Sequence, residues 1–249
     1  MTPEEKFMFD LEGYIVIKKC LDAGGSCCVE CVGGPTVYGK AGTSRPSAER
    51  GFPVGPEAQA LIDHPKIVPY LLELLGPKFR IDHDYCIFMT KGGRAGGLHG
   101  GEGHSDGEAD HWYRYRDGVM RNGLTVVTFF LTHADQGDGG FACAGQPQKQ
   151  LCENLPDDVR MFERVPHYVT QPAVAAGDAL IFTEALIHGT MPWAADHERR
   201  ALLYKFSPGH SSWANTYYNP ADYPTATEQQ IRIMAAPSVG RRPNSIAEG

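Results

Sequence analysis

The sequence predicts a mainly β fold of the α+β class, built around a β-sandwich or jelly roll. Short apolar runs of strand-like composition recur from residue 79 onward, whereas helical patterns are few. The 29 glycines and 18 prolines are spread along the chain, which favours many turns over long helices. Short strands joined by such turns are typical of sandwiches and jelly rolls.

The first predicted elements are a helix over residues 3–10 and a strand over residues 13–18. Thr2 is placed to cap the helix, because its hydroxyl can accept a hydrogen bond from a free backbone N–H, and Pro3 suits the first helical position. In the strand, Tyr14 and the residues that alternate with it share one face.

The next part of the chain is predicted to be irregular and then helical. Residues 22–56 are rich in Gly, Pro, Ser and Thr, which indicates a long loop. Residues 56–75 have a helical pattern that we expect to break near Pro65 and Pro69. Gly76 is expected to end it. The strands expected after this point cover residues 79–90, 124–132, 168–170, 179–182 and 201–207.

Length and composition predict a single domain over residues 1–249. The chain could form one large core or two small ones, but no linker or change in composition divides it. Hydrophobic residues make up 42% and charged residues 21% of the chain, an ordinary balance for a globular protein.

The net charge of −7 comes without a basic stripe, which argues against a nucleic-acid partner. No apolar run approaches the roughly 20 residues that a membrane span needs. The N-terminus has no apolar region typical of a signal peptide, so we expect a cytoplasmic protein.

The cysteines are expected to be ordinary reduced thiols. Their number, seven, is odd, and no signal peptide is evident. Cys27, Cys28 and Cys31 lie close together, but a structural zinc site usually needs a second pair of ligands. The remaining cysteines are Cys20, Cys86, Cys143 and Cys152.

The most informative motif couples His188 to Arg199. His188 follows an apolar strand-like run, and Arg199 stands eleven residues later at the start of another. A neutral imidazole suits a divalent transition metal such as iron. A guanidinium group suits a carboxylate held beside that metal.

These residues resemble the phytanoyl-CoA dioxygenase family of iron(II)/2-oxoglutarate oxygenases. Residues 188–190 match its His-Gly-Ser/Thr motif, and Arg199 has the spacing of its 2-oxoglutarate-binding arginine. Residues 9–17 resemble its Phe-x-x-x-Gly-Tyr-x-Val segment. Residues 123–132 and 137–141 resemble its central strand and turn.

One segment departs from the family pattern. Residues 145–149 read Gly-Gln-Pro-Gln-Lys where members usually have Pro-Gly-Ser-His-Lys. The resemblance implies a double-stranded β-helix core, jelly-roll and cupin-like, with flanking helices. It also implies an oxygenase that uses Fe(II), 2-oxoglutarate and O2 to hydroxylate a small-molecule substrate, with desaturation and cyclisation as variants.

The second metal-binding segment of the family, His-x-Asp, has two candidates here. His104 and Asp106 match its spacing, whereas His99 lies closer to the preceding strand and has Gly101 at the aspartate position. The favoured ligands are His99, Asp106 and His188, with His104 as the alternative to His99.

Two other functions stay open beside the oxygenase. A jelly roll that has lost its iron would be a non-catalytic binding protein. A site without the carboxylate would have room for chloride, as in 2-oxoglutarate-dependent halogenases that resemble this superfamily. A zinc hydrolase is disfavoured, since no His-Glu-x-x-His motif is present.

Arg199 is expected to anchor 2-oxoglutarate, with Thr190 as a second hydrogen-bond donor to the same carboxylate. Arg200 would face the other way and pair with Asp196 or Glu198. Side chains expected to line the substrate pocket are His111, Trp112, Tyr113 and Trp193.

Overall fold

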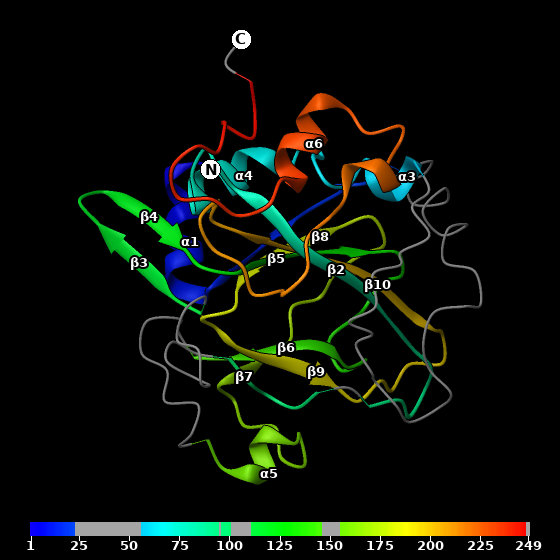
Figure 1. Cartoon of the computed structure of the whole chain (residues 1–249). Helices are drawn as coiled ribbons and strands as arrows, with labels where there is room; N and C mark the ends of the chain where they lie inside the picture. Colours follow the sequence, from blue (N-terminus) through cyan, green and yellow to red (C-terminus); the bar gives the residue numbers. More distant parts are fainter. Residues whose placement is uncertain (23–55, 95, 101–110, 146–154, 248–249) are drawn as a thin grey trace.

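The computed structural model describes residues 1–22, 56–94, 96–100, 111–145 and 155–247 (Figure 1). The predicted loop after residue 22 and the cluster of Cys27, Cys28 and Cys31 therefore lie outside the described residues. The helices are α1 (Pro3–Glu12), α3 (Pro56–Gln59), α4 (Val68–Leu75), α5 (Asp157–Arg160), α6 (Glu228–Met234) and the 3-10 helix η2 (Pro220–Asp222).

The strands form two facing antiparallel sheets and one hairpin. The larger sheet has the order β1-β8-β5-β10-β2, the smaller sheet β7-β6-β9, and β3 pairs with β4. The strands are β1 (Tyr14–Ile17), β2 (Arg80–Met89), β3 (Tyr113–Arg116), β4 (Val119–Asn122), β5 (Thr125–Phe130), β6 (Gly140–Ala144), β7 (Val169–Thr170), β8 (Ala179–Thr183), β9 (Ile187–Met191) and β10 (Arg199–Ser207). The predicted mainly β fold is confirmed.

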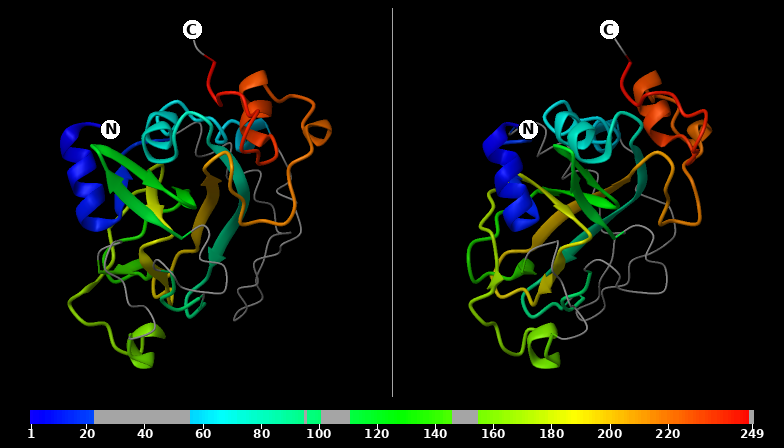
Figure 2. Two further views of the ribbon diagram at one scale, coloured as in Figure 1. Left: turned by 60° about the vertical axis from the view of Figure 1, so that its left-hand side comes forward. Right: turned by 90° about the vertical axis from the view of Figure 1, so that its left-hand side faces the viewer.

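The two sheets and the helices pack together with three apolar layers between and around them. One layer fills the space between the larger sheet and helices α1, α4 and α6, a second lies between the two sheets, and a third lies behind the smaller sheet beside α5. Figure 2 shows α5 and the other helices at opposite ends of the molecule. The helices cover only the outer faces, so the inner faces of both sheets are left to build a site.

The N-terminal elements form as local chemistry predicts. The Thr2 hydroxyl accepts a hydrogen bond from the Glu5 N–H at 3.2 Å, and the Glu5 carboxylate accepts one from the Thr2 N–H at 2.6 Å. This reciprocal capping box fixes the start of α1. Gly13, at φ 76, ends the helix. Tyr14 and Val16 share one face of β1, as predicted, and this face is turned to the layer between the sheets.

One predicted helix break is wrong. Pro69 does not interrupt the helical pattern but stands in the first turn of α4, where its missing N–H costs nothing. The break lies before it, in the turns that separate α3 from α4. Gly76 ends α4, as predicted, and its N–H donates to the Leu72 carbonyl at 3.0 Å.

Strand β10 begins two residues earlier than predicted, so Arg199 and Arg200 both lie within it. Ala201 and Leu203 pack between the sheets, whereas Leu202 and Tyr204 pack against the helices. Odd-numbered residues of β10 therefore face the smaller sheet.

Cys20, Cys86 and Cys143 are free thiols, as expected. Among the described residues, no helix is long and apolar enough to span a membrane.

Candidate metal centre

Two histidines from distant parts of the chain meet at the edge of the smaller sheet. The His99 N–H donates to the His188 carbonyl at 2.8 Å, and the His188 N–H donates back to the His99 carbonyl at 2.8 Å. This antiparallel bridge joins the Gly-rich segment 96–100 to β9. Directly paired residues point to the same face, and the two imidazole centroids lie 4.5 Å apart.

Gly100 permits this close approach. Its φ is +94°, and a Cβ at this position would lie 2.6 Å from the Leu186 carbonyl oxygen and 3.2 Å from His188 Nδ1. A larger residue would push the segment away from β9, so glycine is required beside the histidine pair.

Hydrogen bonds to the backbone fix the tautomer of both rings. His99 Nδ1 lies 2.8 Å from the Gly97 carbonyl oxygen, and His188 Nδ1 lies 2.8 Å from the Leu186 carbonyl oxygen. Because a carbonyl only accepts, both Nδ1 atoms carry the proton and both Nε2 atoms keep a free lone pair. This arrangement also orients metal-binding histidines in known sites.

A buried carboxylate stands beside the two imidazoles. Glu184 lies in the turn between β8 and β9, and its Oε2 is 3.6 Å from His188 Nε2. One ligand atom each of His99, Glu184 and His188 lies within 4.8 Å of the others. Lys205 Nζ lies 2.6 Å from Glu184 Oε1, and His111 Nε2 lies 3.8 Å from Oε2. Two imidazoles and one carboxylate form a donor set that suits iron(II).

Burial sets the charges of this cluster. Burial lowers the pKa of His188 to about 3, although Glu184 acts in the opposite direction. The imidazole is therefore neutral at pH 7, as a metal ligand must be. Burial acts to raise the pKa of Glu184, but the nearby Lys205 ammonium and the imidazoles of His188 and His111 together outweigh it and hold that pKa below its ordinary value.

The structure therefore locates two of the four ligands that the sequence predicts. The structure brings His99 and His188 together. His104 and Asp106 lie outside the described residues. Sequence reasoning missed Glu184, and a signal was present: it is a single charged residue within the apolar run of residues 179–187.

Arg199 is a buried cation without an acidic partner among the described residues. Only 2% of the residue is exposed, its Nε has no hydrogen-bond partner, and one terminal nitrogen lies 3.7 Å from Met89 Sδ. No acidic side chain in the described ranges lies within ion-pair distance of it. Burial lowers the pKa of Arg199 to about 10, so it stays charged at pH 7. Gly140 leaves room for it, since a Cβ there would lie 2.9 Å from Arg199 Nε.

Thr190 alternates with His188 along β9 and therefore shares its face. Its own N–H donates to the Gly96 carbonyl at 3.0 Å, which ties the Gly-rich segment to β9 a second time. Arg200 faces outward, as predicted, and its Nε lies 3.6 Å from Glu198 Oε2.

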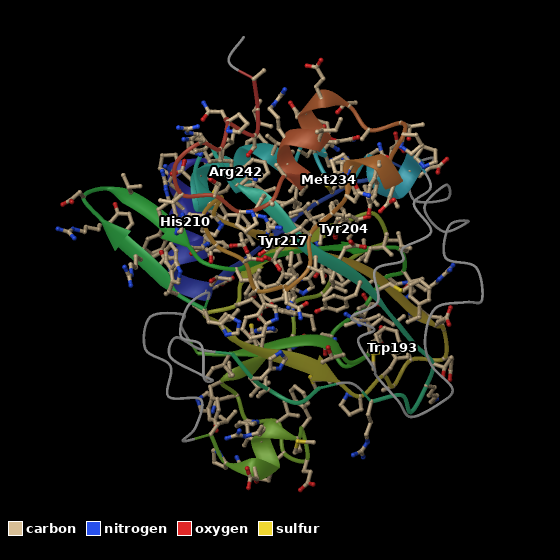
Figure 3. The ribbon with its side chains drawn as sticks, viewed as in Figure 1. Trp193, Tyr204, His210, Tyr217, Met234 and Arg242 are labelled. Carbon is tan, nitrogen blue, oxygen red and sulfur yellow. The ribbon has the colours of Figure 1, made fainter. Side chains whose placement is uncertain are left out.

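The four predicted substrate-pocket residues separate in the structure. His111 stacks on Trp213 at 5.0 Å and lies beside Glu184. The Arg114 guanidinium lies over the Trp112 ring, 5.4 Å from its centroid. Trp193 is buried nearer the smaller sheet, and its indole N–H donates to the His197 carbonyl at 2.6 Å (Figure 3).

Tyr113 is not brought to the site. Its hydroxyl donates to the Asp10 carboxylate, and its ring packs with Phe9 in the layer below the helices. Tyr113 begins the β3–β4 hairpin. His111 is therefore the member of this stretch that lies beside Glu184.

A second group of possible ligands lies at the surface. His133, Asp138 and His197 also offer atoms within 4.8 Å of one another. His197 Nε2 already donates to the His133 carbonyl at 3.0 Å, and the His133 side chain is 54% exposed. This second cluster provides a natural control for experiments on the buried one.

Comparison with known proteins identifies the fold. No protein-family model matches the chain, and no curated protein matches it. Among solved structures, HygX from Streptomyces hygroscopicus with nickel and 2-oxoglutarate bound is 18% identical, with a TM-score of 0.69 over 85% of this chain and 89% of that chain. Other HygX structures hold iron, or hygromycin B together with nickel and 2-oxoglutarate.

Two structures from nogalamycin biosynthesis are also similar, each 14% identical with a TM-score of 0.61. The non-heme alpha-ketoglutarate-dependent carbocyclase SnoK matches 84% of this chain and 85% of its own. The corresponding epimerase SnoN matches 98% of both chains. The predicted jelly-roll core is therefore confirmed, and it is shared with iron/2-oxoglutarate-dependent enzymes.

Proposed function

We propose that this protein is an Fe(II)- and 2-oxoglutarate-dependent oxygenase that acts on a small molecule. The fold is that of such enzymes, and the described residues that could hold a metal fit iron(II). His99 and His188 hold their Nδ1 atoms on backbone carbonyls, which leaves the Nε2 atoms for a metal, and ligand atoms of both rings and of a carboxylate lie within 4.8 Å of one another. The sequence resemblance to the phytanoyl-CoA dioxygenase family supports the same class.

The observation that carries the proposal is that the buried charge of Arg199 has no acidic partner in the part of the chain that the structure describes. A buried guanidinium without a counter-ion is strongly destabilising, so a site that keeps one is built for an anion. Arg199 and the histidine pair both face the space between the two sheets. The far carboxylate of 2-oxoglutarate would compensate Arg199, and its keto-acid end would reach the metal.

When bound, iron(II) with 2-oxoglutarate and O2 supplies the oxidising power that removes hydrogen from a C–H bond. The chain's own residues perform the positioning. The backbone carbonyls of Gly97 and Leu186 hold the two rings in one tautomer. Arg199 fixes one end of the cosubstrate by a charge-assisted pair. The apolar residues between the sheets, such as Phe141 and Phe182, exclude water.

The substrate is proposed to be a small molecule that enters beside His111 and Trp213. Their stacked rings lie next to Glu184, and half of Trp213 is exposed. Hydroxylation is the expected outcome, because it is the usual one in this class. The HygX structure with hygromycin B shows that a protein of this fold binds a small molecule.

Anaerobic absorption spectroscopy tests this function. Adding iron(II) and then 2-oxoglutarate to the purified protein under argon should give a visible charge-transfer band that saturates at one equivalent per chain. Zinc should give none, because the band requires the iron d electrons. A protein that binds neither metal nor 2-oxoglutarate would instead be a non-catalytic jelly-roll binding protein.

A further inference from the structure

We propose that Glu184 supplies the carboxylate ligand of the metal centre, in the role that a His-x-Asp motif would give to an aspartate. This inference rests on the proposed function. The chain reads His99-Gly100-Gly101 at the histidine nearest the site, so the motif's own aspartate position carries no side chain that could ligate. A carboxylate ligand would then come from another residue, either Glu184 beside the histidine pair or Asp106, which lies outside the described residues.

The position of Glu184 meets this need. Its Oε2 lies 3.6 Å from His188 Nε2, and one of its oxygens lies within 4.8 Å of ligand atoms of both histidines. Metal–ligand bonds of about 2.1 Å at right angles place neighbouring ligand atoms about 3 Å apart. Side-chain movements of under about 2 Å would therefore bring ligand atoms that lie within 4.8 Å of one another onto a face of two nitrogens and one oxygen around one ion.

The local fold also fixes where this carboxylate points. Glu184 lies in the tight turn that leads directly from β8 into β9, where the Leu186 N–H donates to the Thr183 carbonyl at 3.0 Å. The Glu184 N–H donates to the Leu124 carbonyl at 3.0 Å. The backbone of the residue is thus anchored on both sides, and only 2% of it is exposed.

Lys205 leaves one oxygen of Glu184 for the metal. Its ammonium lies 2.6 Å from Oε1, while Oε2 faces the imidazoles of His188 and His111. A buried ion pair alone would satisfy Lys205 but would not explain why the second oxygen turns toward two histidines. A carboxylate bound to metal through one oxygen and to an ammonium through the other explains both contacts.

The assignment has a chemical consequence. With Glu184 as the third protein ligand, the centre would carry the carboxylate that a halogenase lacks where it holds chloride. The proposal therefore favours oxygenation over halogenation at this centre.

The test is nickel(II) binding by isothermal titration calorimetry, with nickel(II) as an air-stable probe. All variants carry His133→Ala, which removes the surface cluster. Glu184→Gln keeps the size of the side chain but removes the ligand charge, and we expect it to weaken nickel(II) binding more than about 10-fold, since even indirect partners of metal sites contribute 10–100-fold. Glu184→Asp should recover part of the affinity. Glu198→Gln, at an exposed carboxylate that pairs with Arg200, is the matched control and should stay within about twofold, whereas Asp106→Asn tests the sequence-based alternative.

Thermal unfolding with and without nickel(II) keeps the test independent of folding defects. The His133→Ala parent should gain stability from the metal, and Glu184→Gln should lose most of that gain whatever its stability without metal. Unchanged affinity in Glu184→Gln, or a large loss in Asp106→Asn, would overturn the assignment of Glu184 alone. A parent protein that binds no nickel(II) and no iron(II) would overturn the proposed function as well.

Discussion

Replacement of His188 by alanine should abolish iron-dependent turnover of 2-oxoglutarate. His188 offers a neutral Nε2 from a ring that is buried and fixed by the Leu186 carbonyl, so nothing nearby can take its place. Loss of a direct ligand should weaken iron(II) binding more than the 10–100-fold typical of indirect partners. Iron(II) affinity is measured under argon. Succinate formation is measured after O2 is admitted to the iron-loaded protein.

The neighbouring histidines provide the controls. His99→Ala should be as inactive as His188→Ala, because the two residues pair through their backbones and share one face of the sheet. His133→Ala, at the exposed cluster, should keep full activity. His104→Ala should show a mild defect. If His104→Ala is inactive and His99→Ala is active, the centre uses the other histidine of the sequence-based alternatives.

Replacement of Arg199 by alanine should raise the KM for 2-oxoglutarate far more than Arg200→Ala does. Removal of one partner from a buried charged pair typically costs about 2–5 kcal/mol, which corresponds to roughly 30-fold or more in affinity. Arg200 lies on the opposite face of β10, pairs with Glu198 and stacks on Phe88, so its loss should leave the KM within about twofold.

Steady-state kinetics with varied 2-oxoglutarate separate the two variants. Because Arg199 is buried, the stability of each variant should be compared by thermal unfolding. An Arg199→Lys variant should recover part of the affinity, since it keeps a cation but loses the two-pronged geometry. Equal and modest effects of Arg199→Ala and Arg200→Ala would show that a different group binds the cosubstrate.

Local chemistry explains which elements were predictable from the sequence. The capping box of Thr2 and Glu5 and the glycine at residue 13 determine α1 without help from the rest of the chain. The alternation in β1 and the strand-like runs of β2, β5, β8 and β10 likewise depend only on residues that are neighbours in the sequence.

Strands that depend on distant partners were missed. β6 is a short strand of mostly small residues that begins at the second of two glycines, and these glycines indicate a turn unless the pairing with β9 is known. The β3–β4 hairpin did carry a signal in the sequence, which is the Asp117-Gly118 pair. Both residues adopt positive φ in the turn that joins the strands. An Asp-Gly pair between strand-like segments is a strong hairpin indicator.

The residues of the candidate site also divide into those predictable from spacing in the sequence and those that only the fold brings together. His188 and Arg199 were found because they lie eleven residues apart at the ends of two predicted strands. The pairing of His99 with His188 depends on a backbone bridge across almost ninety residues, so spacing alone left His99 and His104 as alternatives. The ion pair of Glu184 and Lys205 joins the turn between β8 and β9 to strand β10 and became visible only in the fold.

The central claim is that the histidine pair and Arg199 together form a centre for iron(II) and 2-oxoglutarate. Succinate formation by the purified protein, measured with iron(II), with zinc(II) and with a metal chelator, tests it most directly. We expect 2-oxoglutarate to be converted to succinate only with iron(II), with no conversion in the His188→Ala variant. Equal succinate formation under all three conditions, or none with iron(II) and O2, would contradict the claim.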